Sequence, residues 1–176
     1  MSMICELFII PARTARELIA DPTGVHKLLE SLEGSDQVLS LEKSWHGLHF
    51  VLTETAWEGR PPLDFLASGG VPVGDEDVGY GPARILDPEG VTALDEALTE
   101  IEQSDFHRNF DPIALSDAAI YPQIWDEPVE DQARIRWLPA RNEGPRSSRL
   151  EIRTGTAGGN PVDAAPRRLC VAKRRS

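Results

Sequence analysis

Residues 41–53 of the chain, LEKSWHGLHFVLT, decide the fold because they fit either a helix or a strand. A helix brings His46 and His49 within one turn of each other, whereas a strand points the two histidines to opposite faces. The large apolar residues recur at helical spacing, and only Val51 and Thr53 are β-branched. We therefore predict a mainly helical segment in which both histidines reach one common ligand.

The residues before this stretch predict a strand followed by two helices. The short apolar run Cys5–Ile10 is typical of a strand and is followed by a proline. Thr14 and Glu17 have the spacing of a capping box, which predicts that a helix starts there. The dipeptide Asp21-Pro22 predicts the start of the second helix, whose apolar residues recur at i, i+3, i+4 and i+7 before a glycine.

Two more helices are predicted after a connector rich in glycine and proline, residues 57–88. Long connectors of this kind are often functional. The dipeptide Asp87-Pro88 opens a helix with one apolar stripe, and Ser104 is expected to cap a short helix that ends before Asp111-Pro112. Together these patterns predict a single α+β domain with helices packed on a small mixed sheet.

The connector also holds two motifs that resemble ligand loops. The acidic run Asp75–Asp77 resembles a calcium loop, but Leu86 stands where an EF-hand has its glutamate. Residues 79–82, GYGP, lack the third glycine of a dinucleotide-binding fingerprint. We predict turns at both places, with no metal ion and no cofactor.

Charge is divided unevenly along the chain. Residues 1–130 hold 7 Lys and Arg against 25 Asp and Glu, a net charge of −18, whereas residues 131–176 hold 11 against 4, a net charge of +7. An acidic body repels phosphate backbones and anionic lipids, so we expect it to bind neither nucleic acid nor membrane. An apolar run long enough for a signal peptide or a membrane span is also missing, and the two cysteines form no disulfide pattern. These features predict a soluble cytoplasmic protein.

Four motifs occur in an order and spacing that resemble a known family. They are WHGLHF at 45–50, GYGPA at 79–83, FDP at 110–112 and IYPQIW at 120–125. On these motifs the chain resembles the YfbM-like family of bacterial proteins, a domain of unknown function (DUF1877), over residues 1 to about 130. The resemblance implies an α+β fold and supplies no activity, substrate or cofactor.

Residues 131–176 depart from that family, whose members close with an amphipathic helix and a short apolar strand. The segment is rich in arginine, proline and glycine and has no sustained helix or strand period. The chain has 15 Arg against 3 Lys, which suggests a genome rich in G and C, where an out-of-frame reading gives such residues. We interpret 131–176 as a poorly ordered tail produced by a frameshift near Asp131. A genuine basic arm and a folded C-terminal variant are the alternatives.

Six side chains are candidates for a binding site, because histidines and large amphipathic aromatic residues are common at recognition surfaces. They are Trp45, His46, His49, Tyr80, Tyr121 and Trp125. We predict an interaction or binding module for an unknown protein or small-molecule ligand, with self-association if the core is incomplete. A small enzyme or ligand-binding protein that uses His46 and His49 is the alternative. A neutraliser of a basic partner, similar to an immunity protein, is the third.

Overall fold

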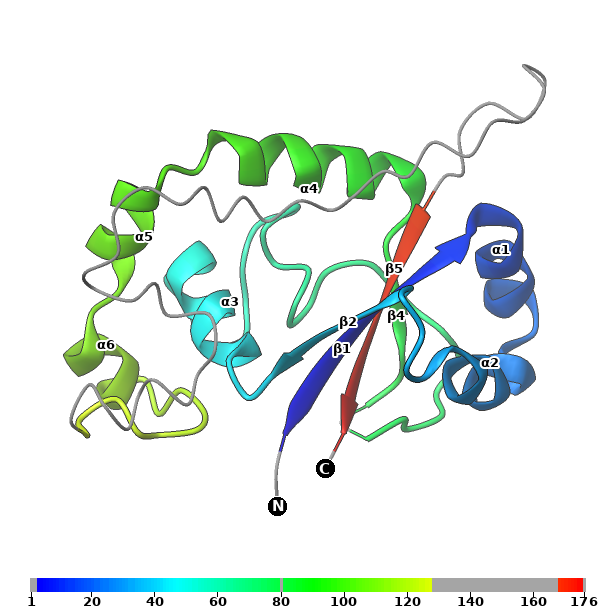
Figure 1. Ribbon diagram of the computed structural model, residues 1–176, viewed down its shortest axis with the longest axis horizontal. Coiled ribbons are helices and arrows are strands. Elements are labelled where there is room, and N and C mark those ends of the chain that lie inside the picture. The colour runs from blue at the N-terminus through cyan, green and yellow to red at the C-terminus, as the bar shows by residue number, and fades with distance from the viewer. Residues whose placement is uncertain (1–2, 80, 128–167, 176) are drawn as a thin grey trace.

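One antiparallel sheet runs through the computed structural model, which describes residues 3–79, 81–127 and 168–175. Its strands lie in the order β2-β1-β5-β4-β3. Their bounds are Ile4–Pro11 for β1, Val38–Glu42 for β2, Val71–Pro72 for β3, Arg84–Ile85 for β4 and Arg168–Arg175 for β5. Figure 1 shows this sheet crossing the molecule between two groups of helices.

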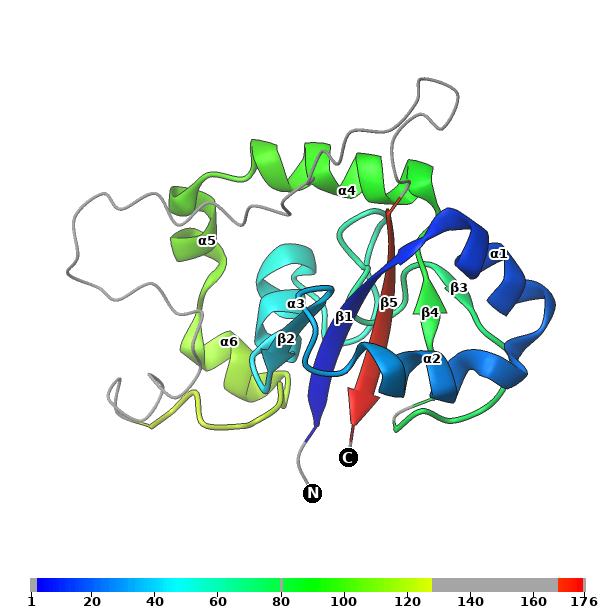
Figure 2. The ribbon, with the colours of Figure 1, turned by 45° about the vertical axis from the view of Figure 1, so that its right-hand side comes forward.

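The described residues form six α-helices and one 3-10 turn around the sheet. Their bounds are Ala12–Ala20 for α1, Pro22–Gly24 for the 3-10 turn η1, Val25–Leu32 for α2, Trp45–Thr53 for α3, Pro88–Glu100 for α4, Gln103–Asn109 for α5 and Pro112–Asp117 for α6. In both ribbon views α1 and α2 lie together at one end, and α3, α5 and α6 lie together at the other (Figures 1 and 2). The predicted α+β fold is confirmed.

Strand β1 separates two apolar cores because its side chains alternate between the two faces of the sheet. Phe8 and Ile10 are buried in the first core, with side chains of α1 and α2. Cys5 and Leu7 belong to the second core, with Trp45 of α3 and residues of α4. The predicted N-terminal strand is therefore confirmed, and it is the strand against which α3 is placed.

A third core lies under α5 and α6. Leu115, Ile120 and Trp125 are buried there, and Phe50 of α3 packs against them. Helix α3 therefore contributes side chains to two cores, with Trp45 in the second and Phe50 in the third.

The predicted helix start at Asp87 is confirmed, and the short helix α5 ends before Asp111 as predicted. Asp87 caps α4 by accepting a hydrogen bond from the Gly90 N–H at 2.6 Å, and Asp111 caps α6, a helix that we did not predict, by accepting one from the Ile113 N–H at 2.9 Å. Asp21 caps the 3-10 turn that leads into α2. Each carboxylate oxygen satisfies an N–H group that the first helical turn leaves without a partner.

Other local predictions are wrong. Helix α1 starts at Ala12 after Pro11, without the predicted capping box. Glu17 instead forms an ion pair with Arg13 at 2.8 Å. Ser104 lies inside α5, whose start is fixed by the hydrogen bond from the Glu102 N–H to Asp105 at 3.0 Å. The spacing of polar residues does not distinguish a cap from a polar first turn.

The predicted helix at 41–53 is confirmed over Trp45–Thr53, but residues 38–42 form strand β2. The sheet is also not mixed, since every strand pair among the described residues is antiparallel. The sheet is antiparallel rather than mixed because β5 lies between β1 and β4 and runs opposite to both.

Strand β5 corrects the interpretation of the C-terminal segment. We expected residues 131–176 to lack regular structure, yet Arg168–Arg175 pairs with all eight residues of β1. Residues 131–167 lie outside the described part of the chain. A run of only four apolar residues, 169–172, is too short to predict a strand unless its partners are known. The chain therefore has a short closing strand of its own, and the frameshift stays a hypothesis for the coding DNA to test.

The connector is fixed to the sheet by Arg84 of β4. Its guanidinium donates to the carbonyls of Ser68 at 2.7 Å, Gly69 at 2.8 Å and Gly70 at 2.8 Å. Gly70 has φ +75°, and a Cβ there would lie 2.6 Å from the Ile85 carbonyl oxygen. The connector is thus held by specific contacts at this point.

Val171→Pro should destabilise the full chain by about 2 to 3 kcal/mol. Val171 lies opposite Phe8 in one ladder and opposite Ile85 in the other, so proline removes a backbone donor between two paired strands. Urea unfolding monitored by circular dichroism measures the change. An unchanged unfolding midpoint would show that the sheet does not depend on β5.

Candidate functional site

Helix α3 brings the two candidate histidines into the interior of the protein. His46 is 1% exposed and His49 is not exposed at all. The helix starts directly after β2 and the turn at Lys43 and Ser44, and it ends at Glu54, whose N–H donates to the Phe50 carbonyl at 2.6 Å. Buried polar side chains require hydrogen-bond partners, so the contacts of these histidines determine what they can do.

His46 connects three segments through its two ring nitrogens. Its Nε2 lies 2.7 Å from the Ala56 carbonyl oxygen, and its Nδ1 lies 3.1 Å from the backbone nitrogen of Tyr121. A carbonyl only accepts and an N–H only donates, so Nε2 carries the hydrogen and Nδ1 accepts. His46 is therefore the neutral tautomer, and both of its nitrogens are engaged by backbone groups.

His49 fixes the same loop at a second point. Its Nε2 lies 2.9 Å from the Glu58 carbonyl oxygen, two residues beyond the carbonyl that His46 binds. The Thr53 hydroxyl donates to the His49 carbonyl at 2.8 Å, and the Thr55 hydroxyl donates to the Glu58 carbonyl. The two histidines thus hold residues 54–58 against α3 and direct their Nε2 atoms to different carbonyls. The geometry gives them separate acceptors where we predicted one common ligand.

Three aromatic rings form a cluster that reaches the surface; we call it the aromatic stack after its stacked pair, Trp45 and His46. The third ring, Trp57, is tilted by 38° against His46 and by 54° against Trp45. Trp45 is fully buried, and its ring lies 4.9 Å from that of His46 at an interplanar angle of 17°. The ring of Trp57 lies 4.3 Å from His46 and 6.0 Å from Trp45. Trp57 is 49% exposed. The sequence analysis missed Trp57 as a site residue, although a tryptophan at the start of a glycine- and proline-rich connector was a usable signal.

The other predicted site residues divide between this stack and the core. Tyr121 lies beside His46 through its backbone, and its hydroxyl accepts a hydrogen bond from the Met3 N–H at 3.1 Å. Trp125 is 1% exposed, donates to the Ile120 carbonyl at 2.7 Å and meets Phe110 edge-on at 6.0 Å. Tyr80 lies outside the described residues. The structure therefore brings Trp45, His46, His49 and Tyr121 to one region and places Trp125 in the neighbouring core.

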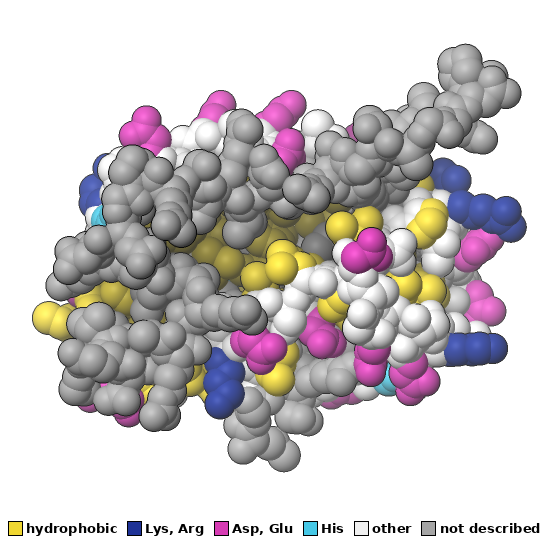
Figure 3. Space-filling view, viewed as in Figure 1, with side chains coloured by type: hydrophobic (Ala, Val, Ile, Leu, Met, Phe, Trp, Pro, Cys, Tyr) yellow, Lys and Arg dark blue, Asp and Glu magenta, His cyan; other side chains and the backbone are white. Residues whose placement is uncertain are grey.

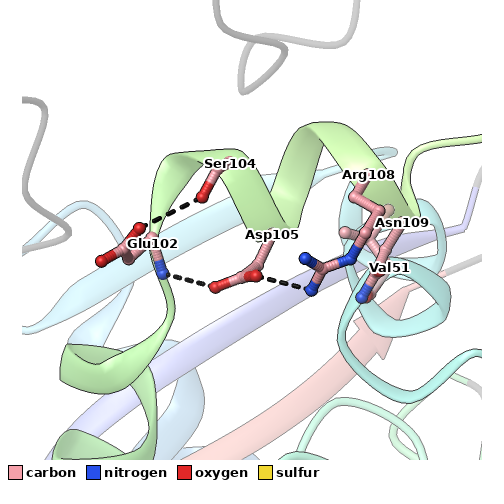
Figure 4. A network of polar contacts seen from close by, with 6 residues as sticks. All are labelled: Val51, Glu102, Ser104, Asp105, Arg108 and Asn109. Carbon is pink, nitrogen blue, oxygen red and sulfur yellow. Dashed lines mark hydrogen bonds and ion pairs between the residues drawn. The ribbon is translucent and has the colours of Figure 1, made fainter.

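Helix α5 supports the far end of α3 through a polar network (Figure 4). The Asn109 side chain donates to the Val51 carbonyl at 3.2 Å, in the last turn of α3. Asp105 accepts from the Glu102 N–H at 3.0 Å and from Arg108 at 2.6 Å, which fixes the start of α5. The Glu102 backbone hydrogen bond, together with Arg108, holds the pKa of Asp105 below its usual value.

Strained backbone is concentrated around α3 and the Tyr121 turn. Among the described residues, the non-glycine residues with left-handed φ angles are Glu42, Glu54, Ala119 and Gln123, at 49°, 58°, 52° and 60°. Glu42 and Glu54 flank α3, and the other two flank Tyr121. Such conformations cost roughly 1 to 3 kcal/mol each and gather at functional sites. The strain therefore marks the same region as the aromatic stack.

The structure shows a turn at the acidic run of the connector. Asp77 accepts hydrogen bonds from the N–H groups of Gly79 at 2.6 Å and Gly81 at 3.0 Å. Within the described residues, His, Cys, Asp and Glu side chains form no group of three that could hold a metal ion. No helix in that part of the chain is long and apolar enough to cross a membrane.

Comparison with known proteins gives a family and a related fold. Residues 1–138 match the family described as a domain of unknown function, DUF1877. The structure is similar to the crystal structure of YfbM, a protein of unknown function from Escherichia coli. That protein has 21% sequence identity and a TM-score of 0.53, and the match covers 75% of this chain and 87% of the other. At this identity the likeness concerns the fold alone. No curated protein matches the chain.

His46→Ala should destabilise the protein by about 2 to 4 kcal/mol, because it opens a cavity and leaves the buried Tyr121 N–H without its acceptor. His46→Asn should cost less, since its side-chain oxygen can replace Nδ1 as the acceptor. His26→Ala is the control, because the His26 side chain is 41% exposed and contacts the exposed Glu76. Thermal and urea unfolding measure all three. Equal losses for His46→Ala and His26→Ala would contradict the structural role of His46.

Asp105→Asn should destabilise the protein at neutral pH and have less effect in acid. The pKa of Asp105 is lower in the folded state than its ordinary value of 3.8, so its ionised form stabilises the fold above about pH 4. That stabilisation is lost as pH falls through the folded pKa. Urea unfolding of wild type and variant from pH 7 to pH 3 measures the difference, which should shrink below pH 4. A constant difference would contradict this contribution.

Proposed function

The chain belongs to the DUF1877 family, and from its own geometry we propose that it is a binding module that recognises a protein partner through the Trp57 surface. We define this surface as Trp57 with Glu54 and Glu58, the exposed glutamates of the same loop. The observation that carries the proposal is the half-exposed Trp57 ring, which lies on a fixed and buried aromatic base.

An exposed indole on a rigid base is suited to binding. Tryptophan is enriched among the residues that contribute most to interface energy, because it buries a large area with few rotatable bonds. The base under Trp57 is fixed, since His46 is hydrogen bonded to Ala56 and to Tyr121. A partner would therefore meet a surface that is already ordered, and binding would cost little conformational entropy.

The enzyme alternative has less support from the same contacts. A general base needs a nitrogen within hydrogen-bond reach of a substrate proton. The Nε2 atoms of His46 and His49 are both engaged by backbone carbonyls of residues 54–58. A substrate or small-molecule ligand would have to displace that loop before either Nε2 could act on it. Protein binding needs no such movement.

The compartment in this proposal is the cytoplasm. The chain has two cysteines, Cys5 and Cys170, near its opposite ends and without a disulfide framework in their spacing, which is the cysteine usage expected in a reducing compartment. The acidic body opposes binding to nucleic acid or anionic membrane, as the charge of residues 1–130 suggests.

Trp57→Ala should abolish binding of the partner while leaving the fold intact. Affinity capture with the full chain from extracts of the cells that produce it should recover a partner with wild type and with Ile113→Ala. Ile113 is the matched control, because it is 72% exposed and lies on α6. A loss of at least about 2 kcal/mol, roughly 30-fold in affinity, is expected for Trp57→Ala alone. Equal recovery of the partner by wild type and Trp57→Ala would show that the Trp57 surface does not bind the partner.

A further inference from the structure

We propose that the Trp57 surface binds a basic segment of a partner protein, with an arginine or lysine side chain placed over the Trp57 ring. This inference rests on the proposed function and specifies the chemistry of the partner. It is drawn from three features that occur together: an exposed indole, exposed carboxylates beside it and a neutral ring beneath it.

The exposed indole supplies the attraction for a cation. The face of a tryptophan ring carries negative charge density and attracts ammonium and guanidinium groups, more strongly when the pair is shielded from water. The histidine beneath Trp57 is the neutral tautomer, since Nδ1 of His46 accepts a hydrogen bond from the Tyr121 N–H. No cation therefore already occupies the inner side of the ring at this contact.

Carboxylates adjoin the ring in sequence and in space. Glu58 is the next residue and Glu54 precedes Trp57 by three positions, and both are exposed. Arg60 is the basic residue of this loop. Ala56 packs in the third core with Trp125, so the exposed Asp126 and Glu127 that follow Trp125 lie in the same part of the molecule. The loop that carries Trp57 therefore holds two exposed carboxylates against one basic side chain, Arg60.

The rest of the body adds to this local field. Figure 3 shows carboxylates along α4 and around the end formed by α1 and α2. Residues 1–130 carry a net charge of −18, which would raise the encounter rate of a basic partner and repel an acidic one. The long-range field favours a partner with positive charge, and the indole determines where on the surface that partner binds.

The test uses the full chain and two synthetic probe peptides that differ in charge alone. One is an acetylated and amidated (Gly-Arg)₄ peptide, and the other carries citrulline, the neutral isostere, in place of each arginine. Isothermal titration calorimetry at 50 mM salt should show at least tenfold tighter binding of the arginine peptide. Trp57→Ala should weaken that binding at least fivefold, and raising the salt to 300 mM should weaken it as well.

A matched pair of variants separates the site from general charge attraction. The double variant Glu54→Gln/Glu58→Gln should weaken arginine-peptide binding at least fivefold. The control is the double variant Glu30→Gln/Asp36→Asn, which makes the same change in net charge. Both positions are exposed, one in α2 and the other in the turn that follows it. Helix α2 packs on the other face of β1, away from α3. The control should change binding less than twofold. Equal losses from the two double variants would overturn the proposal.

The two proposals fail differently. If the arginine and citrulline peptides bind equally, or neither binds, the basic chemistry of the partner is wrong. The proposed function still stands in that case if Trp57→Ala abolishes capture of a cellular partner. If Trp57→Ala keeps both the captured partner and the peptide, both proposals are wrong.

Discussion

The hydrogen bonds of one buried imidazole hold together the part of the protein that contains the candidate site. His46 donates to the Ala56 carbonyl and accepts from the Tyr121 N–H, so it links α3 to the loop after it and to a turn 75 residues away. Neither contact involves another side chain. A buried imidazole can satisfy two backbone groups of opposite polarity at once, which explains why this position favours histidine over an apolar residue.

The two faces of β1 explain where α3 must lie. Alternation along one strand directs Phe8 and Ile10 to the core under α1 and α2, and Cys5 and Leu7 to the core under Trp45. Phe50, on another side of α3, then packs in the third core. A helix between two cores has few polar positions that can face water, and this accounts for the burial of both histidines.

Local chemistry made some elements predictable. A carboxylate followed by proline is a strong signal for the start of a helix, and at Asp87 it predicted α4. The same signal at Asp111 precedes α6, which we did not predict. The apolar spacing from Trp45 to Leu52 similarly predicted α3. Trp45, His46, His49 and Tyr121 lie together while Trp125 is a core residue, and a binding role for these side chains stays a prediction.

Features that depend on partners distant in sequence were not predictable. Strands β2 and β5 are recognised by their pairing with β1, and neither has a distinctive pattern of its own. The role of Trp57 depends on the fold of residues 54–58 over His46, which follows from hydrogen bonds to carbonyl groups that any residue type supplies. Because every residue has a backbone carbonyl, the sequence does not show which carbonyls accept these hydrogen bonds.

The position of β5 makes completion of the sheet depend on residues that are far apart in the chain. Ile4 pairs with Arg175, 171 positions later, and β5 lies between β1 and β4 in the sheet. Contacts between residues so distant in sequence form slowly, because the chain must close a long loop before they can be made. The helices depend on local hydrogen bonds, so the five-strand order of the sheet is expected to be completed after them.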